Sequence, residues 1–281
     1  EYGQHKAIQV YTCDLLPNSE MGEPEYIRKH GIKTVKAPFS QAHCSALEKH
    51  EVQEYNTAVI ATNTMTTAEW IESVAFACLI QAFHNIGFFR TVALYLRNEL
   101  SVSYYNIYSL IADYSAKNPD SACGSVRSII TNLANGMAQG KNGWAAPCEG
   151  LGDICWQFDE IYFMKSLERA DEIFDELEAL LCKEYGNLPA LKAAFDYQRR
   201  ILKRPNNSGR IEIESGYDFY NYCKRIYEGR YSPLEKKKTI LTVSGTVPCN
   251  TLLDYACSVV WYGRNQAAAL YSSDCYSPEI L

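Results

Sequence analysis

Residues 57–70 read Thr57-Ala58-Val59-Ile60-Ala61-Thr62-Asn63-Thr64-Met65-Thr66-Thr67-Ala68-Glu69-Trp70, and this stretch decides how the chain is organised. The apolar run 57–61 does not alternate with polar residues, which predicts a strand that is buried on both faces. Thr66 and Glu69 have the spacing of a helical capping box, so a helix is expected to begin there. The stretch therefore predicts a strand, a polar loop at 62–65 and a helix, in that order.

Upstream of this stretch, the sequence has the pattern of further α/β structure. Residues 8–11 and 32–36 are short β-type runs, and a helix is expected from Pro24 to Gly31 between them. Strands that are linked through helices are typical of parallel sheets, which need neighbouring strands on both sides and helices on both faces. Residues 1–66 contain too few strands to meet that need. We therefore expect them to be the end of a larger α/β barrel, in which chemistry lies just past the strand ends.

Residues 67–281 are expected to form a mainly helical domain. Its first helix carries apolar residues around most of its circumference, which is typical of a helix at the centre of a domain. Further helices are predicted at 92–98, 104–115, 119–133, 154–185, 189–203, 217–228 and 251–262, and short strands near 211–214 and 239–243. The predicted fold class is α+β and predominantly helical, with a few N-terminal strands left over from an α/β barrel followed by a helical domain with a small β element.

Composition and charge narrow the function classes. The chain has 281 residues, 47% of them hydrophobic, and a formal net charge of −6, so it can bury a core but lacks the basic excess of a nucleic-acid binder. Its most apolar stretch, 74–89, is too short and too polar to span a bilayer. Its 11 cysteines are irregularly spaced and include no C-x-x-C pair, which favours reduced thiols in a cytoplasmic protein.

Several segments resemble the region that follows the catalytic core in cobalamin-binding radical S-adenosylmethionine (SAM) proteins. The two most specific blocks are Asp14-Leu-Leu-Pro-Asn-Ser-Glu-Met21 and Ala61-Thr-Asn-Thr-Met-Thr-Thr-Ala-Glu-Trp70. The other similar segments are Pro24-Glu-Tyr26, Gly31-Ile-Lys-Thr-Val35, Gln81-Ala-Phe-His84 and Val259-Val-Trp-Tyr-Gly-Arg264. Together these segments touch most of the chain.

The resemblance implies a full protein with three parts: a cobalamin-binding domain, a radical SAM barrel and a largely helical C-terminal domain. This chain would be the third part with the end of the second, and the missing N-terminal domains of the same polypeptide would be its partners. The full-length protein would use a 4Fe-4S cluster, S-adenosylmethionine and cobalamin for radical methyl transfer or a rearrangement on an unknown small organic substrate. The family's cluster motif, C-x-x-x-C-x-x-C, is absent from this sequence, so we expect the chain to bind none of these cofactors and to be inactive alone.

Two polar loops after expected strands contain candidate substrate-binding residues. The first loop contributes Asn18, Ser19 and Glu20, and the second contributes Asn63 and Thr64. Each group has a plain structural alternative, because Pro and Asn favour turns by themselves and because Thr and Asn commonly cap helices. The resemblance adds weight to the substrate-binding interpretation for both loops.

A glycine-rich loop, Gly140 to Gly152, carries Trp144 and is the best candidate for a lid. A flexible loop with one large aromatic residue can close over a ligand, and the alternative is a surface connection between two helices. Trp144 is therefore included among the candidate substrate-binding residues. No residue of this chain is expected to be catalytic or to hold a metal.

Three other features are interpreted as structural. His43 and Cys44, with His50 nearby, lack the four ligands of a zinc site, and adjacent side chains diverge too far for a Cys-His nucleophile. His84 is interpreted as a satisfied core histidine, with proton transfer as the alternative. The acidic run 171–178 is interpreted as a solvated helix face.

Two further function classes stay open. A stand-alone helical binding or assembly module without catalysis is the main alternative to the radical SAM assignment, and an independent Cys-dependent hydrolase is the least favoured. A start codon immediately before Glu1 would count against the radical SAM assignment, whereas an upstream frame with the cluster motif would support it. A missing barrel would also leave an apolar patch exposed, through which self-association is expected.

Overall fold

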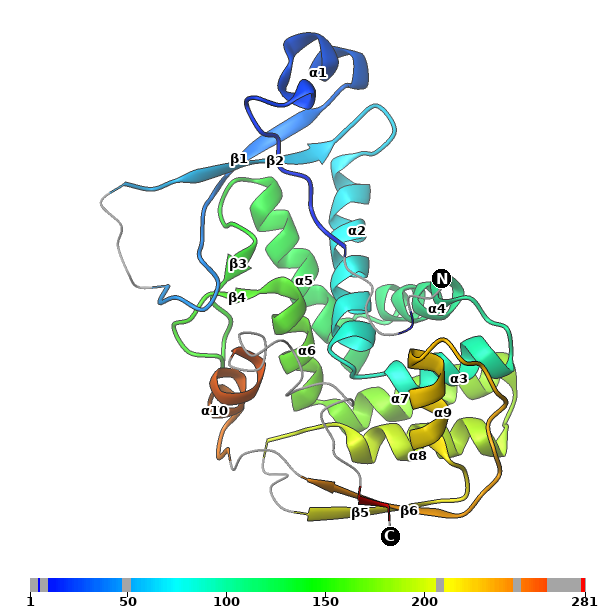
Figure 1. Ribbon diagram of the computed structural model, residues 1–281. Coiled ribbons are helices and arrows are strands. Elements are labelled where there is room, and N and C mark those ends of the chain that lie inside the picture. The colour runs from blue at the N-terminus through cyan, green and yellow to red at the C-terminus, as the bar shows by residue number, and fades with distance from the viewer. Residues whose placement is uncertain are drawn as a thin grey trace.

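The computed structural model describes residues 5, 10–46, 52–205, 210–244, 249–261 and 279–280. A body of packed helices lies below a small sheet, and α1 lies on the other side of that sheet (Figure 1). The helices are α1 (Pro24–His30), α2 (Thr67–Ile80), α3 (Arg90–Glu99), α4 (Tyr104–Lys117), α5 (Ala122–Ala138), α6 (Phe158–Glu168), α7 (Ala170–Tyr185), α8 (Pro189–Ile201), α9 (Phe219–Tyr227) and α10 (Leu252–Tyr255). The strands are β1 (Lys33–Pro38), β2 (Tyr55–Ala61), β3 (Ala145–Ala146), β4 (Trp156–Gln157), β5 (Arg210–Ser215), β6 (Thr239–Ser244) and β7 (Glu279–Ile280). Short turns of other helical types are η1 (Glu20–Gly22), η2 (Gln81–Asn85) and η3 (Ala256–Trp261). The predicted class, predominantly helical α+β, is confirmed.

The predicted start of α2 is confirmed by its capping box. The Thr66 hydroxyl accepts a hydrogen bond from the backbone N–H of Glu69 at 3.2 Å, and the Glu69 carboxylate accepts one from the backbone N–H of Thr66 at 2.7 Å. The helix packs against α4, α5 and α6 and buries Trp70, Val74 and Leu79. It is therefore the central helix of the body, as its apolar circumference predicted.

At its C-terminal end, α2 passes into the π-helical turn η2 and the chain then bends into α3. The buried Arg90 closes this bend by donating a hydrogen bond from Nε to the carbonyl of His84 at 2.5 Å. From α8, Gln198 accepts from the backbone N–H of Thr91 at 2.7 Å and donates to the Gly87 carbonyl at 3.0 Å. These side chains satisfy backbone groups that helix ends leave without intrahelical partners.

In the described ranges, no single helix is long and apolar enough to cross a membrane. The helical stretches 67–85 and 90–99 reach that length and composition only as a pair, and the pair is bent by 89°. Residues 90–96 of this pair are buried inside the protein.

The expectation of parallel βα units is wrong for β1 and β2. The two strands pair in antiparallel register, with Val35 opposite Ala58. The other edge of β2 is bridged, also antiparallel, by Asp14, whose neighbours in the chain exchange backbone hydrogen bonds with Thr57 and Val59. A parallel crossover needs a long connection, usually a helix, and the described part of the link between β1 and β2 contains no helix. A barrel remnant is therefore not confirmed.

The link after β1 instead runs to the β4 region. The backbone N–H of His43 donates to the carbonyl of Cys155 at 2.7 Å, which ties this link to the chain just before β4. The strand expected at 8–11 falls partly outside the described residues, and Val10 and Tyr11 are not in a strand.

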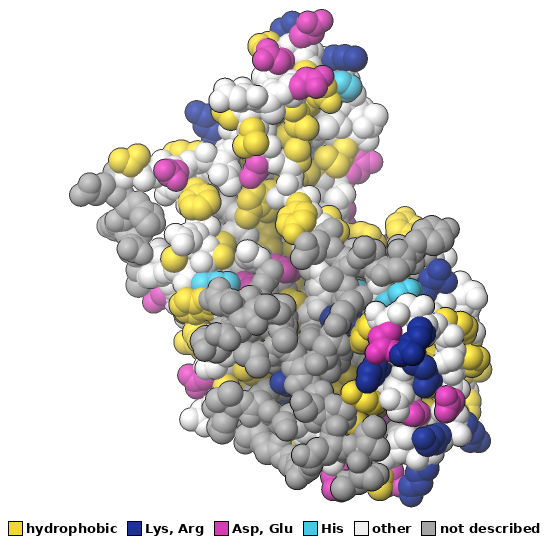
Figure 2. All heavy atoms as spheres, viewed as in Figure 1, with side chains coloured by type: hydrophobic (Ala, Val, Ile, Leu, Met, Phe, Trp, Pro, Cys, Tyr) yellow, Lys and Arg dark blue, Asp and Glu magenta, His cyan; other side chains and the backbone are white. Residues whose placement is uncertain are grey.

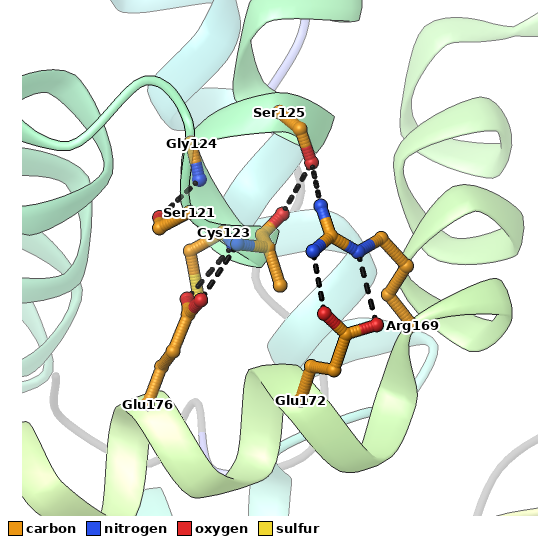
Figure 3. Close-up of polar contacts among 8 residues, drawn as sticks. Ser121, Cys123, Gly124, Ser125, Arg169, Glu172 and Glu176 are labelled. Atoms are coloured by element: carbon orange, nitrogen blue, oxygen red, sulfur yellow. Dashed lines mark hydrogen bonds and ion pairs between the residues drawn. The ribbon is translucent and has the colours of Figure 1, made fainter.

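The predicted helix 154–185 is divided into α6 and α7. The chain leaves the helical conformation at Arg169, where φ is −120° and ψ is 28°. The Arg169 guanidinium then donates to Ser125 Oγ on α5 at 2.7 Å and to Glu172 Oε2 on α7 at 2.5 Å, as Figure 3 shows. The sequence also misplaced the start of α5, because Ser121 caps this helix whereas Asn118 ends α4.

The interpretation of the acidic run 171–178 as a solvated face is wrong for Glu176. Its carboxylate accepts hydrogen bonds from the backbone N–H groups of Ala122 at 2.6 Å and Cys123 at 3.0 Å (Figure 3). A negative charge at a helix N-terminus is favourable, because the exposed N–H groups there carry partial positive charge. Glu176 therefore joins α7 to the start of α5.

The β element near the C-terminus is confirmed at both predicted places. β5 and β6 pair in antiparallel register, and β7 adds to the other edge of β6. The predicted last helix starts with Thr251 as its cap, continues as α10 and passes into η3.

Candidate functional site

A cavity of about 950 Å³ opens between the β1–β2 sheet and α2. The stretches of chain that meet around it include 10–13, 37–42, 62–65 and 143–145, which are far apart in sequence. Figure 2 shows apolar side chains gathered on this face, between the α1 end of the protein and the helical body. Among the lining residues that the structure describes there is no Lys or Arg. The cavity therefore has the apolar walls and scattered polar groups of a small-molecule site.

Three aromatic side chains form one wall of the cavity. The rings of Trp70 and Trp144 have centroids 5.8 Å apart, and Trp144 lies 6.2 Å from the ring of Phe158. All three residues line the cavity, and they come from α2, the glycine-rich loop and the start of α6. Such a wall can hold an apolar or planar group by burial and ring packing.

The indole of Trp144 contacts the carboxylate of Asp14. Its indole Nε1 lies 3.5 Å from one Asp14 carboxylate oxygen, and Asn56 donates to the other oxygen at 3.3 Å. Burial raises the pKa of Asp14, and the contact with Trp144 partly offsets that shift. The predicted lid residue thus contacts Asp14, which bridges to β2, and residues on both sides of the predicted boundary at residue 66 line the cavity.

The loop 62–65 lies at the cavity. Its position between a strand and a helix agrees with the prediction. Asn63 and Thr64 both line the cavity. The Asn63 side chain also donates to the carbonyl of Lys29 at 2.9 Å, which ties the loop to the end of α1. Gly31 makes this approach possible, because a Cβ there would lie 1.9 Å from the Asn63 side-chain oxygen.

Asn18, Ser19 and Glu20 are not among the residues that line the cavity. The Ser19 hydroxyl donates to the carbonyl of Leu16 at 2.7 Å, so this segment forms a tight turn that leads into η1. The same loop contributes Met21 to the cavity instead. Substrate contact by Asn18, Ser19, Glu20, Asn63, Thr64 and Trp144 remains a prediction, and the structure gathers the last three at one cavity.

Sequence reasoning missed several residues of the cavity. Trp70 and Cys78 were assigned to a buried helix and Asp159 fell near the start of the predicted helix 154–185, yet all three line the cavity. Burial raises the pKa of the Cys78 thiol well above its usual range, and the nearby Asp159 adds to the shift. Cys78 is therefore a neutral thiol in the cavity wall. The one signal available was the position of Trp70 at the end of one of the two most specific blocks of the resemblance.

The side chain of His43 contacts Glu160 rather than Cys44. The His43 Nε2 lies 3.0 Å from both carboxylate oxygens of the buried Glu160, and its ring stacks on Trp261 at 5.4 Å. His50 lies outside the described residues. In the described part of the chain, no group of three or more His, Cys, Asp or Glu side chains is placed to hold a metal ion. These residues therefore do not fit an iron–sulfur cluster, which needs three or four thiolates.

His84 is a satisfied core histidine. Its Nε2 donates to the carbonyl of His5 at 3.0 Å, and its Nδ1 accepts from the Tyr108 hydroxyl at 2.9 Å. Burial and, to a smaller extent, the Arg90 cation lower the pKa of His84 to about 3. The interpretation as a core residue is therefore favoured over proton transfer near neutral pH.

Comparison with known proteins gives two curated relatives. The cobalamin-dependent radical SAM methyltransferase TokK of Streptomyces tokunonensis is 31% identical over 242 residues, which cover 79% of this chain and 35% of that protein. The 2-(S-pantetheinyl)-carbapenam-3-carboxylate methyltransferase of Streptantibioticus cattleyicolor is 30% identical over 223 residues, covering 73% and 32%. No protein-family model matches the chain. The chain thus spans about a third of the length of these relatives. Most of its length is similar to part of two methyltransferases, and this similarity supports the cobalamin-dependent radical SAM family that the sequence segments indicated.

Proposed function

We propose that this chain is the C-terminal, substrate-site-shaping portion of a cobalamin-dependent radical SAM methyltransferase. The observation that carries the proposal is the cavity, because the block Ala61–Trp70, which resembles the family, supplies part of its wall together with Trp144. The similarity to two methyltransferases favours methyl transfer over a rearrangement. On this proposal the cavity holds one side of an organic substrate while the rest of the protein performs the radical chemistry.

The distribution of exposed apolar side chains supports a missing neighbour. Of the nine large apolar side chains that are exposed in the described residues, six lie between residues 10 and 55. Three of them, Val10, Tyr11 and Phe39, are also cavity-lining residues. Exposed apolar side chains gathered at one cavity are typical of an interaction surface. We propose that it contacts the N-terminal domains of the same polypeptide.

The cofactors belong to those other domains on this proposal. The sequence has no C-x-x-x-C-x-x-C motif, and the cysteines that the structure describes are not grouped as cluster ligands. We therefore expect this chain to be inactive alone and the longer protein to supply the 4Fe-4S cluster, the S-adenosylmethionine site and the cobalamin site.

The chemistry of the lining indicates which part of a substrate the cavity receives. Its aromatic wall favours an apolar or planar group, and Asn63, Gln81 and Gln157 offer amide hydrogen bonds at its surface. Because the described lining lacks Lys and Arg, a free carboxylate or phosphate of the substrate would lie outside this cavity. We propose that the cavity receives an uncharged part of the substrate.

The test begins with the gene. We expect the reading frame upstream of Glu1 to encode C-x-x-x-C-x-x-C, and the protein from that longer frame to transfer methyl groups from isotopically labelled S-adenosylmethionine to substrate. In that protein, Trp144→Ala should lower kcat/KM for the substrate at least about tenfold, while uncoupled cleavage of S-adenosylmethionine continues.

The matched control is Tyr105→Ala, which removes an exposed aromatic side chain that is not a cavity-lining residue and should leave the activity unchanged. A start codon directly before Glu1, together with ligand binding by this chain alone, would contradict the proposal and favour a stand-alone binding module. Equal activity of the Trp144→Ala and wild-type proteins would show that the cavity is not part of the substrate site.

A further inference from the structure

Two short segments at one edge of the cavity place two cysteines opposite each other. Ser45 and Ile154 form an antiparallel β-bridge. One residue away from this bridge on each segment stand Cys44 and Cys155, and the backbone N–H of Cys155 donates to the Cys44 carbonyl at 2.9 Å. Both cysteines are free thiols.

The backbone hydrogen bond from Cys155 to Cys44 holds the two residues across from each other, next to the bridge. Residues opposite each other on antiparallel strands have Cα atoms about 5.5 Å apart when they are hydrogen-bonded, with side chains on the same face. Disulfides span Cα separations of roughly 4.4–6.8 Å. Cys44 and Cys155 share one of the two hydrogen bonds of such a pair, because the carbonyl of Cys155 accepts from the N–H of His43. We infer from this hydrogen bond and the neighbouring bridge that the two thiols are within reach of each other.

Cys44 also affects the thiol of Cys155 electrostatically. Burial raises the pKa of the Cys155 thiol, and Cys44 is the second cause of the shift. Cys155 is 8% exposed, whereas Cys44 is partly exposed. A soluble reagent therefore reaches Cys44 first.

We propose that Cys44 and Cys155 are a modification site, at which a low-molecular-weight disulfide such as oxidised glutathione produces an intramolecular disulfide. The Cys44 thiolate attacks one sulfur of the reagent, forms a mixed disulfide and releases one glutathione thiolate. The Cys155 thiolate then attacks the Cys44 sulfur and displaces the second glutathione thiolate. The protons of the two protein thiols end on the two glutathione molecules, so the protein pair is oxidised and one reagent disulfide is reduced.

The disulfide would join two parts of the cavity edge. Gln41 and Ala42 line the cavity just before Cys44, and Gln157 and Phe158 line it shortly after Cys155. The two segments are now joined by backbone hydrogen bonds and by the contact between His43 and Glu160. A covalent link would make that edge of the cavity resistant to opening. This site stands on its own geometry, and it does not depend on the proposed methyl transfer.

The experiment incubates the purified protein with oxidised glutathione, blocks the remaining thiols with iodoacetamide, and cleaves the chain after Lys, Arg and Glu residues. Cleavage after Glu149 separates Cys148 from Cys155, so mass spectrometry can assign the linked peptide without ambiguity. We expect a Cys44–Cys155 linked peptide that disappears on reduction, and loss of both of these thiols together. Amide hydrogen exchange should also slow at residues 43–46 and 153–155 after oxidation.

Cys44→Ser and Cys155→Ser should each abolish the linked peptide. The matched control Cys148→Ser, which removes a half-buried thiol of the same loop, should retain it. The wild-type measurement does not depend on the folding of any variant. Glutathione on the exposed Cys13 with Cys44 and Cys155 still alkylated, or a link from Cys44 to another cysteine, would overturn the proposal.

Discussion

At the residue scale, His84 shows how burial decides the role of a titratable side chain. A histidine can serve in proton transfer, yet this buried ring has both nitrogens in hydrogen bonds to Tyr108 and to the His5 carbonyl. Desolvation disfavours the charged imidazolium, and the Arg90 cation adds to that effect. The neutral ring is therefore part of the core.

The lowered pKa of His84 predicts a pH dependence of stability. Between pH 6.5 and about 3, the unfolded chain binds a proton at this histidine that the folded protein does not bind. The free energy of unfolding therefore falls as pH is lowered through this window, by about 2 kcal/mol at pH 5. Urea unfolding at a series of pH values should show this loss, and His84→Gln should flatten it.

A second prediction concerns Gly31, which has a φ of 58° and faces Asn63. Gly31→Ala should lower the free energy of unfolding by about 2 kcal/mol or more, because an L-residue is strained in this conformation and its Cβ would displace the Asn63 side chain. Gly216→Ala is the matched control, since a Cβ there has no neighbour within 4 Å, and it should change stability by less than about 1 kcal/mol. Equal effects of the two variants in urea unfolding would contradict this account. Gly31→Ala is also a control for the pH experiment with His84→Gln. It lowers the free energy of unfolding without removing a titratable group.

At the element scale, the contacts in Figure 3 explain how α5 is held by α7. The first N–H groups of α5 are satisfied by the Ser121 cap and by the Glu176 carboxylate, which comes from 53 and 54 residues away in the chain. Long-range capping of this kind couples the stability of one helix to the position of another.

Glu176→Ala should lower the free energy of unfolding by about 1–3 kcal/mol, because two N–H groups lose a charged acceptor. The control Glu184→Ala removes an exposed carboxylate from the same helix and should cost less than about 0.5 kcal/mol. The same urea titrations measure both variants. A neutral result for Glu176→Ala would mean that water replaces the carboxylate at no cost.

Local sequence signals predicted the helices and strands well. They failed where a contact with a residue far away in the chain determines the structure. The capping box of Thr66 and Glu69 lies within one turn, so the start of α2 could be predicted from sequence. The break at Arg169 depends on a partner in α5, and the antiparallel pairing of β1 depends on where its following loop is anchored, at Cys155. Neither partner can be identified from the sequence around Arg169 or β1. Local signals were enough to predict a site near loop 62–65. Most of the cavity wall could not be predicted, because distant contacts bring its residues together.

At the scale of the whole molecule, the exposed apolar side chains near the cavity predict self-association of this chain when it is produced alone. We expect sedimentation velocity to show concentration-dependent association, and the double variant Tyr11→Ser with Phe39→Ser to shift the protein toward monomer. These two side chains are 80% and 45% exposed. Ile240→Thr, which changes a 43% exposed side chain on β6, should leave the association unchanged. A monomeric wild-type chain at all concentrations would contradict the prediction.

The wide turn η2 has a consequence for how chains of this kind can vary in length. A π-helical turn holds one residue more than an α-helical turn, and each residue of an α-helix rotates the next by about 100°. Loss of one residue from 81–85 would return this turn to regular α-helical winding with little rotation of the chain after it, whereas the same loss within α2 would rotate that chain by about 100°. Among homologous chains, a difference of one residue in the length of this helix should therefore fall at these five positions and be avoided in the rest of α2.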